Sequence, residues 1–204
     1  MLGYLVMGMT YAFAAAVQPG PFQSYLASQA LSLGWRRTLP AALAPLISDG
    51  PIILLVLLVL SRVPGWLQNV LQVAGGAFLL YLAFGAWKAW REYTPGAAGP
   101  VQGNQRTVLK ATLVNLLNPN PYLAWSLVMG PLLLKGWNEA PANGVALLVG
   151  FYATMVACQA VIILLFSAAG GLGPRLGRIL VGVSALALAG FGLYELWTGI
   201  TAIF

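Results

Sequence analysis

Long apolar runs separated by short polar connections dominate this chain and predict membrane-spanning helices. A helix needs about 20 mostly apolar residues to cross the hydrocarbon core of a bilayer. The pattern predicts six such helices, over residues 2–31, 38–60, 65–88, 107–134, 142–169 and 178–203. The first and fourth are longer than one crossing requires because each contains a helix-breaking cluster. We therefore predict an all-α membrane protein with six transmembrane helices, helices 1 and 4 being broken.

The two helix-breaking clusters lie at matching places in helices 1 and 4. The first runs Gln18-Pro19-Gly20-Pro21, and the second runs Asn118-Pro119-Asn120-Pro121. A proline inside a helix removes one N–H and clashes with the carbonyl four residues earlier. Within a bilayer, unpaired backbone is tolerated only where protein or a water-lined cavity satisfies it. Paired interruptions point to the binding site of a transporter, and ordinary proline kinks are the competing interpretation.

Composition places the whole chain, residues 1–204, in one membrane domain surrounded by the lipid bilayer. Charged residues make up 7% of the chain, against roughly 25% in soluble domains. The chain has no histidine, one cysteine and four acidic residues. It therefore lacks the usual zinc ligands and the clustered titratable groups of an enzyme, so we expect no catalysis, no metal and no cofactor. The net charge of +6 does not indicate nucleic acid, because the basic residues flank apolar segments.

The basic residues also predict the orientation, because cytoplasmic loops of membrane proteins are enriched in Lys and Arg. The loops after helices 1, 3 and 5, with their flanks, hold eight of them: Arg36, Arg37, Lys88, Arg91, Arg106, Lys110, Arg175 and Arg178. The opposite side holds Arg62 and Lys135. This bias places both termini outside. No Lys or Arg precedes the apolar run of residues 1–17, so we interpret that run as part of helix 1 rather than as a signal peptide.

The helix count predicts an inverted repeat. Residues 1–90 and 107–204 hold three predicted helices each and are joined by a tether at 91–106, so the second copy enters the membrane from the opposite side. Three pairs of segments match in order, at offsets of 100, 110 and 107: the proline clusters, Ile52–Leu55 with Ile162–Leu165, and Phe84-Gly85 with Phe191-Gly192. Coincidence between apolar segments is the alternative. Lys88 falls opposite Glu195, and we expect both side chains to reach the membrane interface.

Asp49 is the acidic residue that lies nearest the middle of a predicted helix. A carboxylate at the centre of a bilayer costs ~2.5–3.5 kcal/mol and usually marks an ion or proton pathway. Asp49 is therefore a candidate proton carrier or partner for a substrate ammonium group. The competing interpretation is a structural carboxylate that caps a kink beside Gly50-Pro51. The repeat alignment places Gln159 opposite Asp49.

The helix breaks can bind both charges of a zwitterion. Helix segments that restart after Pro21 and Pro121 point N-termini inward, and such ends suit a carboxylate. The carbonyls freed by the prolines suit an ammonium group. We predict a substrate site formed by Gln18, Pro19, Gly20, Pro21, Gln23, Asn118, Pro119, Asn120, Tyr122 and Trp125. The aromatic pair, Tyr122 and Trp125, can face an ammonium group, and plain packing is the alternative for both.

These motifs resemble the signatures of the LysE/RhtB amino-acid exporters. The first signature is Pro19-Gly20-Pro21-Phe22-Gln23, followed by Gln29 and by Ile47-Ser48-Asp49; the second is Asn118-Pro119-Asn120-Pro121-Tyr122-Leu123. The resemblance implies ion-driven export of amino acids or small derivatives from a bacterial cytoplasm, in the inner membrane, often as a homodimer. Exporters of basic amino acids in that family tend to carry an acid where this chain has Ala124. The resemblance therefore favours a neutral or zwitterionic substrate. The acid Asp49, beside two broken helices, leads us to expect that protons move inward through it while the substrate moves outward.

Three other functions compete with this interpretation. An exporter of divalent cations or other ions from the same superfamily needs several oxygen ligands, and Asp49 supplies the one core carboxylate. A membrane-embedded enzyme acting on lipid needs clustered titratable groups, which the predicted helices do not offer. A structural subunit has no need of symmetric broken helices.

Overall fold

The computed structural model describes residues 1–18, 20–58, 65–92, 104–171 and 174–202, and all its elements are helical. They are α1 (Leu2–Val17), α2 (Pro21–Leu33), α3 (Trp35–Thr38), the 3₁₀ segment η1 (Leu39–Leu43), α4 (Ala44–Leu58), α5 (Gly65–Arg91), α6 (Asn104–Leu116), α7 (Pro119–Ala124), the π-helical segment η2 (Trp125–Met129), α8 (Gly130–Glu139), α9 (Pro141–Gly170) and α10 (Pro174–Thr201). The predicted all-α class is confirmed. Most of the predicted tether at 91–106 lies outside the described residues.

Within the described residues, four helical segments are long and apolar enough to cross a membrane. They are Trp35–Val56, Asn69–Lys88, Pro141–Gly170 and Arg178–Thr201. Leu2–Val17 is a shorter apolar helix, and the predicted span at 107–134 is divided among α6, α7, η2 and α8. The chain is a multi-pass membrane protein, and the full set of six spans stays a prediction.

Both predicted helix breaks are present at the proline clusters. Helix α1 ends at Val17, Gly20 is extended (φ −167°, ψ −179°), and α2 begins at Pro21. A proline suits this first helical position because its missing N–H would have no partner there. In the second half, α6 ends at Leu116 and the extended Asn118 caps α7, accepting a hydrogen bond from the Asn120 N–H at 3.0 Å. The second break is therefore capped by a side chain, and the first is not.

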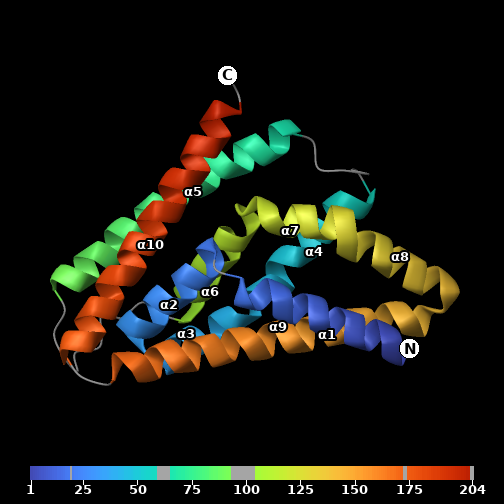
Figure 1. The fold of residues 1–204 in the computed structure, drawn as a ribbon, viewed down its shortest axis with the longest axis horizontal. Helices are drawn as coiled ribbons and strands as arrows, with labels where there is room; N and C mark the ends of the chain where they lie inside the picture. Colours follow the sequence, from blue (N-terminus) through green and yellow to red (C-terminus); the bar gives the residue numbers. More distant parts are fainter. Residues whose placement is uncertain (19, 59–64, 93–103, 172–173, 203–204) are drawn as a thin grey trace.

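Glycines allow α1 and α9 to pack backbone to backbone (Figure 1). A methyl group added at Gly150 of α9 would lie 2.3 Å from the Leu5 carbonyl oxygen of α1. A methyl group at Gly8 of α1 would lie 2.3 Å from the Leu147 carbonyl oxygen of α9. Small residues at helix interfaces allow such close approach in membranes, where packing drives association. This contact fixes α1, and hence the start of the first break, against the longest helix of the protein.

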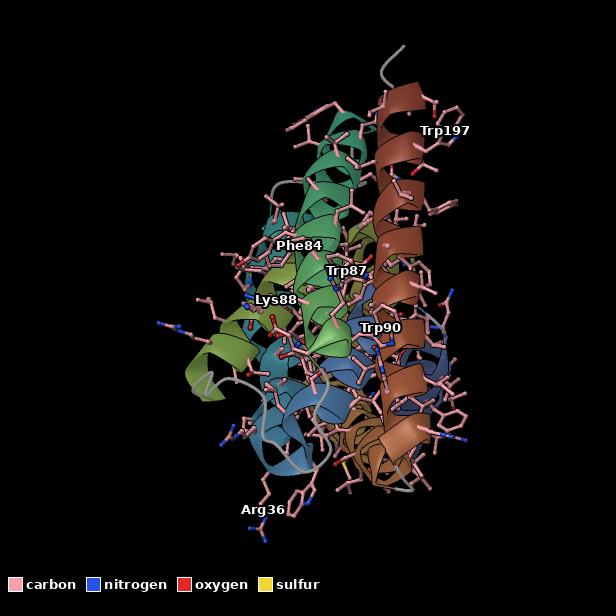
Figure 2. The ribbon with its side chains drawn as sticks, turned by 90° about the vertical axis from the view of Figure 1, so that its left-hand side faces the viewer. Arg36, Phe84, Trp87, Lys88, Trp90 and Trp197 are labelled. Atoms are coloured by element: carbon pink, nitrogen blue, oxygen red, sulfur yellow. The ribbon has the colours of Figure 1, made fainter. Side chains whose placement is uncertain are left out.

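Helices α5 and α10 form a second close pair, which lies to the upper left of α4, α7 and α8 in Figure 1. Gly76 of α5 meets Gly192 of α10, where an added methyl group would lie 2.7 Å from the Gly192 carbonyl oxygen. The outer faces of the pair carry exposed aromatic side chains such as Phe84 and Trp197. In Figure 2, Trp197 lies at the upper end of the pair, with Trp90 lower down and Arg36 at the lower end of the molecule. Exposed apolar faces of this kind suit contact with lipid.

The predicted interfacial position of Glu195 is wrong. Its side chain is 8% exposed and faces the interior of the bundle, whereas Lys88 is exposed. The physical reason is the helix face: Glu195 lies on the side of α10 that packs against α5, and Tyr194 and Trp197 occupy the outward side. Position near a helix end predicted a snorkelling side chain, but the packing of the pair decides where this one points.

Candidate functional site

Both helix breaks and Asp49 line one cavity of about 330 Å³. Pockets of about 300–1,000 Å³ are typical of small-molecule sites. The predicted site residues that line it are Gln18, Gly20, Pro21, Gln23, Asp49, Asn118, Asn120 and Trp125, and Pro121 of the second break lines it as well. Two predicted members do not line it: Pro119 is buried, and Tyr122 donates its hydroxyl to the Leu116 carbonyl at 2.9 Å. Pro19 lies outside the described residues.

Asp49 is 3% exposed and accepts hydrogen bonds from four elements of the fold. The Asn115 side chain of α6 donates to Oδ1 at 3.1 Å, and the neighbouring Ser48 hydroxyl of α4 donates to the same oxygen at 3.4 Å. Trp125 Nε1 of η2 and the Tyr152 hydroxyl of α9 each donate to Oδ2 at 3.4 Å. All four donors are neutral. Asp49 is therefore oriented by its neighbours without being paired with a cation.

Trp125 reaches Asp49 from a π-helical segment. The η2 segment, Trp125–Met129, follows α7 directly, and its first residue is 1% exposed. Short π-helical turns often occur at functional sites because they redirect side chains from the regular α-helical path. The Trp125 ring also packs edge-on against Phe151 of α9, with ring centroids 5.8 Å apart. Trp125 is thus both a packing residue and part of the polar wall of the cavity.

The carbonyls freed by the prolines are partly occupied by the protein itself. The Gln23 side chain donates from Nε2 to the Ala15 carbonyl at 3.4 Å and to the Ala16 carbonyl at 3.3 Å. The Asn118 N–H donates to the Asn115 carbonyl at 3.3 Å. The prolines at positions 19 and 119 predict carbonyls without a helical partner at Ala15 and Asn115, and each of these carbonyls accepts a hydrogen bond from a neighbouring part of the protein. Gln23 spans the first break and ties the start of α2 to the end of α1.

The N-terminus of α2 faces the cavity. Gly20, Pro21, Phe22 and Gln23 all line it. The first N–H groups of a helix have no intrahelical acceptor, and the helix dipole makes this end partly positive. The cavity therefore offers a negative side chain, Asp49, together with a helix end that suits an anion. Such a site can hold two opposite charges of one small molecule.

Sequence reasoning missed several residues of the cavity wall. Gln159 of α9 is 1% exposed, its Nε2 donates to the Met155 sulfur at 3.5 Å, and its Oε1 has no hydrogen-bond partner in the described part of the chain. The repeat alignment placed Gln159 opposite Asp49, and this signal could have found it. Tyr11 and Phe151 also line the cavity, with ring centroids 6.3 Å apart. No motif marks those two, because they reach the cavity through the packing of α1 on α9.

The described part of the cavity wall contains one acidic or basic residue, Asp49. It is the only Asp, Glu, Lys or Arg among the described residues that line the cavity. Across residues 1–18, 20–58, 65–92, 104–171 and 174–202, no cluster of three or more His, Cys, Asp or Glu could hold a metal ion. Ala124 also lies in the wall of the cavity.

Comparison with known proteins supplies the family. The family model of the LysE type translocator matches residues 13–199, which include both helix breaks, Asp49 and every described residue of the cavity wall except Tyr11. Comparisons with curated proteins and with solved structures give no match. Members of the matched family are translocators, and the resemblance seen in the two signatures is confirmed. The chain belongs to the family of LysE type translocators.

Proposed function

We propose that this protein is a secondary active exporter of small amino acids or their derivatives, neutral or zwitterionic, driven by the proton gradient. The observation that carries the proposal is the pairing, in one cavity, of Asp49 with the N-terminus of α2. Asp49 suits an ammonium group or a proton, and the helix end suits a carboxylate. The two charges of an amino acid lie only a few ångströms apart, so one cavity can receive both.

The cavity wall also supports the choice of substrate class. The Gln159 side-chain oxygen, which has no hydrogen-bond partner among the described residues, can accept a hydrogen bond from a substrate ammonium group in the cavity that Asp49 also lines. A substrate with a basic side chain would bring a second positive charge. Among the described residues of the cavity wall, Asp49 is the one acid, and position 124 is an alanine. A divalent cation would need several oxygen ligands, and one carboxylate with neutral amides is a sparse set. A neutral zwitterion therefore fits the charges best.

The mechanism we propose is alternating access between two inverted three-helix repeats. The repeat prediction pairs α1 with α6 and α9 with the segment from α3 to α4. In support of it, α1 packs along α9, and α6 packs along α4 and η1. The broken helices would then meet at the cavity from opposite sides of the membrane. On this proposal both termini lie outside the inner membrane of a bacterium, and a homodimer stays a prediction.

The proposed function is tested by flux measurements in proteoliposomes. Purified protein is reconstituted into liposomes that contain a labelled neutral amino acid. The external pH is then made lower than the internal pH, so that protons tend to flow inward. We expect efflux that follows the size and direction of the gradient and stops when a protonophore removes it. Labelled lysine and arginine serve as matched probes, and each should leave more slowly than the neutral amino acids. Efflux of neutral amino acids no faster than from protein-free liposomes loaded with the same amino acid would contradict the proposal.

A further inference from the structure

A second buried carboxylate lies behind the helix breaks. Glu195 of α10 is 8% exposed and lines a cavity of about 10 Å³, separate from the cavity of Asp49. Its Oε2 atom is buried and has no hydrogen-bond partner in the described part of the chain. Pro21 and Asn118, which begin α2 and cap α7, line this small cavity and the Asp49 cavity alike. The two break residues thus form a wall with one carboxylate on each side.

Helix α5 forms one wall of the small cavity. Gly75 and Leu79 of α5 line it together with Leu117, the residue before Asn118. A methyl group added at Gly75 would lie 2.6 Å from the Leu117 carbonyl oxygen, so the backbone of α5 rests directly on the second break. The volume is close to the minimum that one water molecule needs, about 10–15 Å³. The Oε2 atom of Glu195 is therefore buried where α5 and α10 pack against the broken helices.

Among the described residues that line the small cavity, Glu195 is the one ionisable group. The titratable and charged residues of the elements around it, α2, α5, α6 and α9, are Tyr25, Tyr81, Lys88, Arg91, Arg106, Lys110, Tyr152 and Cys158. Tyr25 donates to the Thr107 carbonyl, Lys110 lies over the Tyr81 ring, and Tyr152 donates to Asp49. A buried carboxylate without a partner takes up a proton rather than stay charged.

We propose that Glu195 is a second proton-binding site that lies behind the helix breaks. Its protonation is linked to the packing of α5 and α10 against the broken helices. The inference rests on the proposed proton-driven export. The neutral acid fits the small, largely apolar cavity, and the charged form needs more water than a cavity of about 10 Å³ holds, which movement of α5 and α10 away from the breaks would admit. Because linkage is reciprocal, lower pH favours the state in which α5 and α10 pack against the breaks. Movement of the two helices away from the breaks releases the proton.

A hydrophobic carbodiimide tests the site without any transport measurement. Dicyclohexylcarbodiimide adds to protonated carboxyl groups in apolar surroundings, and peptide mass spectrometry locates the adduct. We expect an adduct at Glu195 that weakens as the pH rises and disappears in Glu195→Gln. The exposed Glu139 should carry none, so it serves as the matched control. Absence of the adduct at Glu195, or labelling no stronger than at Glu139, overturns the proposal.

Transport by Glu195→Gln provides the second measurement. Glutamine resembles the protonated acid in shape and hydrogen bonding, so the variant should fold and insert. We expect it to export more slowly than the unaltered protein and to lose the dependence of export on internal pH, while Glu139→Gln changes neither. An unchanged pH profile overturns the linkage. If Glu195 is labelled but no amino acid is exported, the proposed function fails; if export occurs and Glu195 is not labelled, this inference alone fails.

Discussion

Replacing Asp49 with asparagine is expected to abolish proton-driven export while leaving the protein folded and inserted. Asparagine has nearly the same shape, and its one oxygen can still accept from Trp125 and Tyr152. Its amide nitrogen then replaces the oxygen that accepts from Asn115. Asparagine cannot take up or release a proton, so the proton gradient no longer drives export of the substrate. It also removes the negative charge that faces the cavity, and hydrogen bonds to charged groups contribute about 1.5–3 kcal/mol.

The measurement separates coupling from binding. Exchange of labelled for unlabelled substrate across the proteoliposome membrane needs no net proton movement, so it reports on binding and the conformational change. We expect exchange by Asp49→Asn to fall by about 10-fold to 100-fold at limiting substrate, and net gradient-driven efflux to be lost. Glu139→Gln, which changes an exposed acid, should leave both rates intact. Undiminished gradient-driven efflux by Asp49→Asn would remove Asp49 from the coupling mechanism.

Replacing Gly150 with alanine is expected to destabilise the protein, and replacing it with leucine to prevent folding. The added methyl group would meet the Leu5 carbonyl oxygen at 2.3 Å, and the atom in the way is backbone that cannot rotate aside. Overpacking typically costs about 1–3 kcal/mol even where side chains can adjust. Helix α1 would be pushed off α9, and Tyr11 would leave the wall of the cavity with it.

Gly190 offers the matched control for this prediction. It also lies within a long helix, α10, but nothing approaches the position of an added methyl group within 4 Å. Purified variants are heated in detergent, and the fraction that stays monodisperse is followed by size-exclusion chromatography. We expect Gly150→Ala to lose monodispersity at a lower temperature than Gly190→Ala. Equal midpoints would show that α1 and α9 do not pack as closely as described.

The sequence predicted the helix breaks and Asp49 because both are local signals. A proline ends a helix through its own ring, and a carboxylate within an apolar run is conspicuous against its neighbours. The 3₁₀ segment Leu39–Leu43 in the second predicted span was not predicted, although Pro40 and Pro45 lie within or beside it. A run of apolar residues set the length of that span, and periodicity alone did not reveal how the prolines shape its backbone.

The surroundings of the two carboxylates depend on packing and could not be predicted from the sequence. Tyr152 reaches Asp49 from a helix more than a hundred positions away. Glu195 points inward because the glycines of α5 and α10 bring that face of the pair onto the second break. Neither contact leaves a mark in local sequence. The Ala15 carbonyl at the first break likewise accepts a hydrogen bond from Gln23, a contact that the local sequence did not reveal.

The central claim, that the cavity between the breaks binds the substrate, is tested most directly by protection of a single cysteine. In a Cys158→Ser background, Ala124→Cys places a thiol in the cavity wall, and Ala142→Cys places one on an exposed turn near the start of α9. A small water-soluble maleimide is applied with and without a neutral amino acid that the protein exports. The account predicts that substrate slows labelling of Ala124→Cys and leaves Ala142→Cys unaffected. Equal labelling of Ala124→Cys with and without saturating substrate would contradict it.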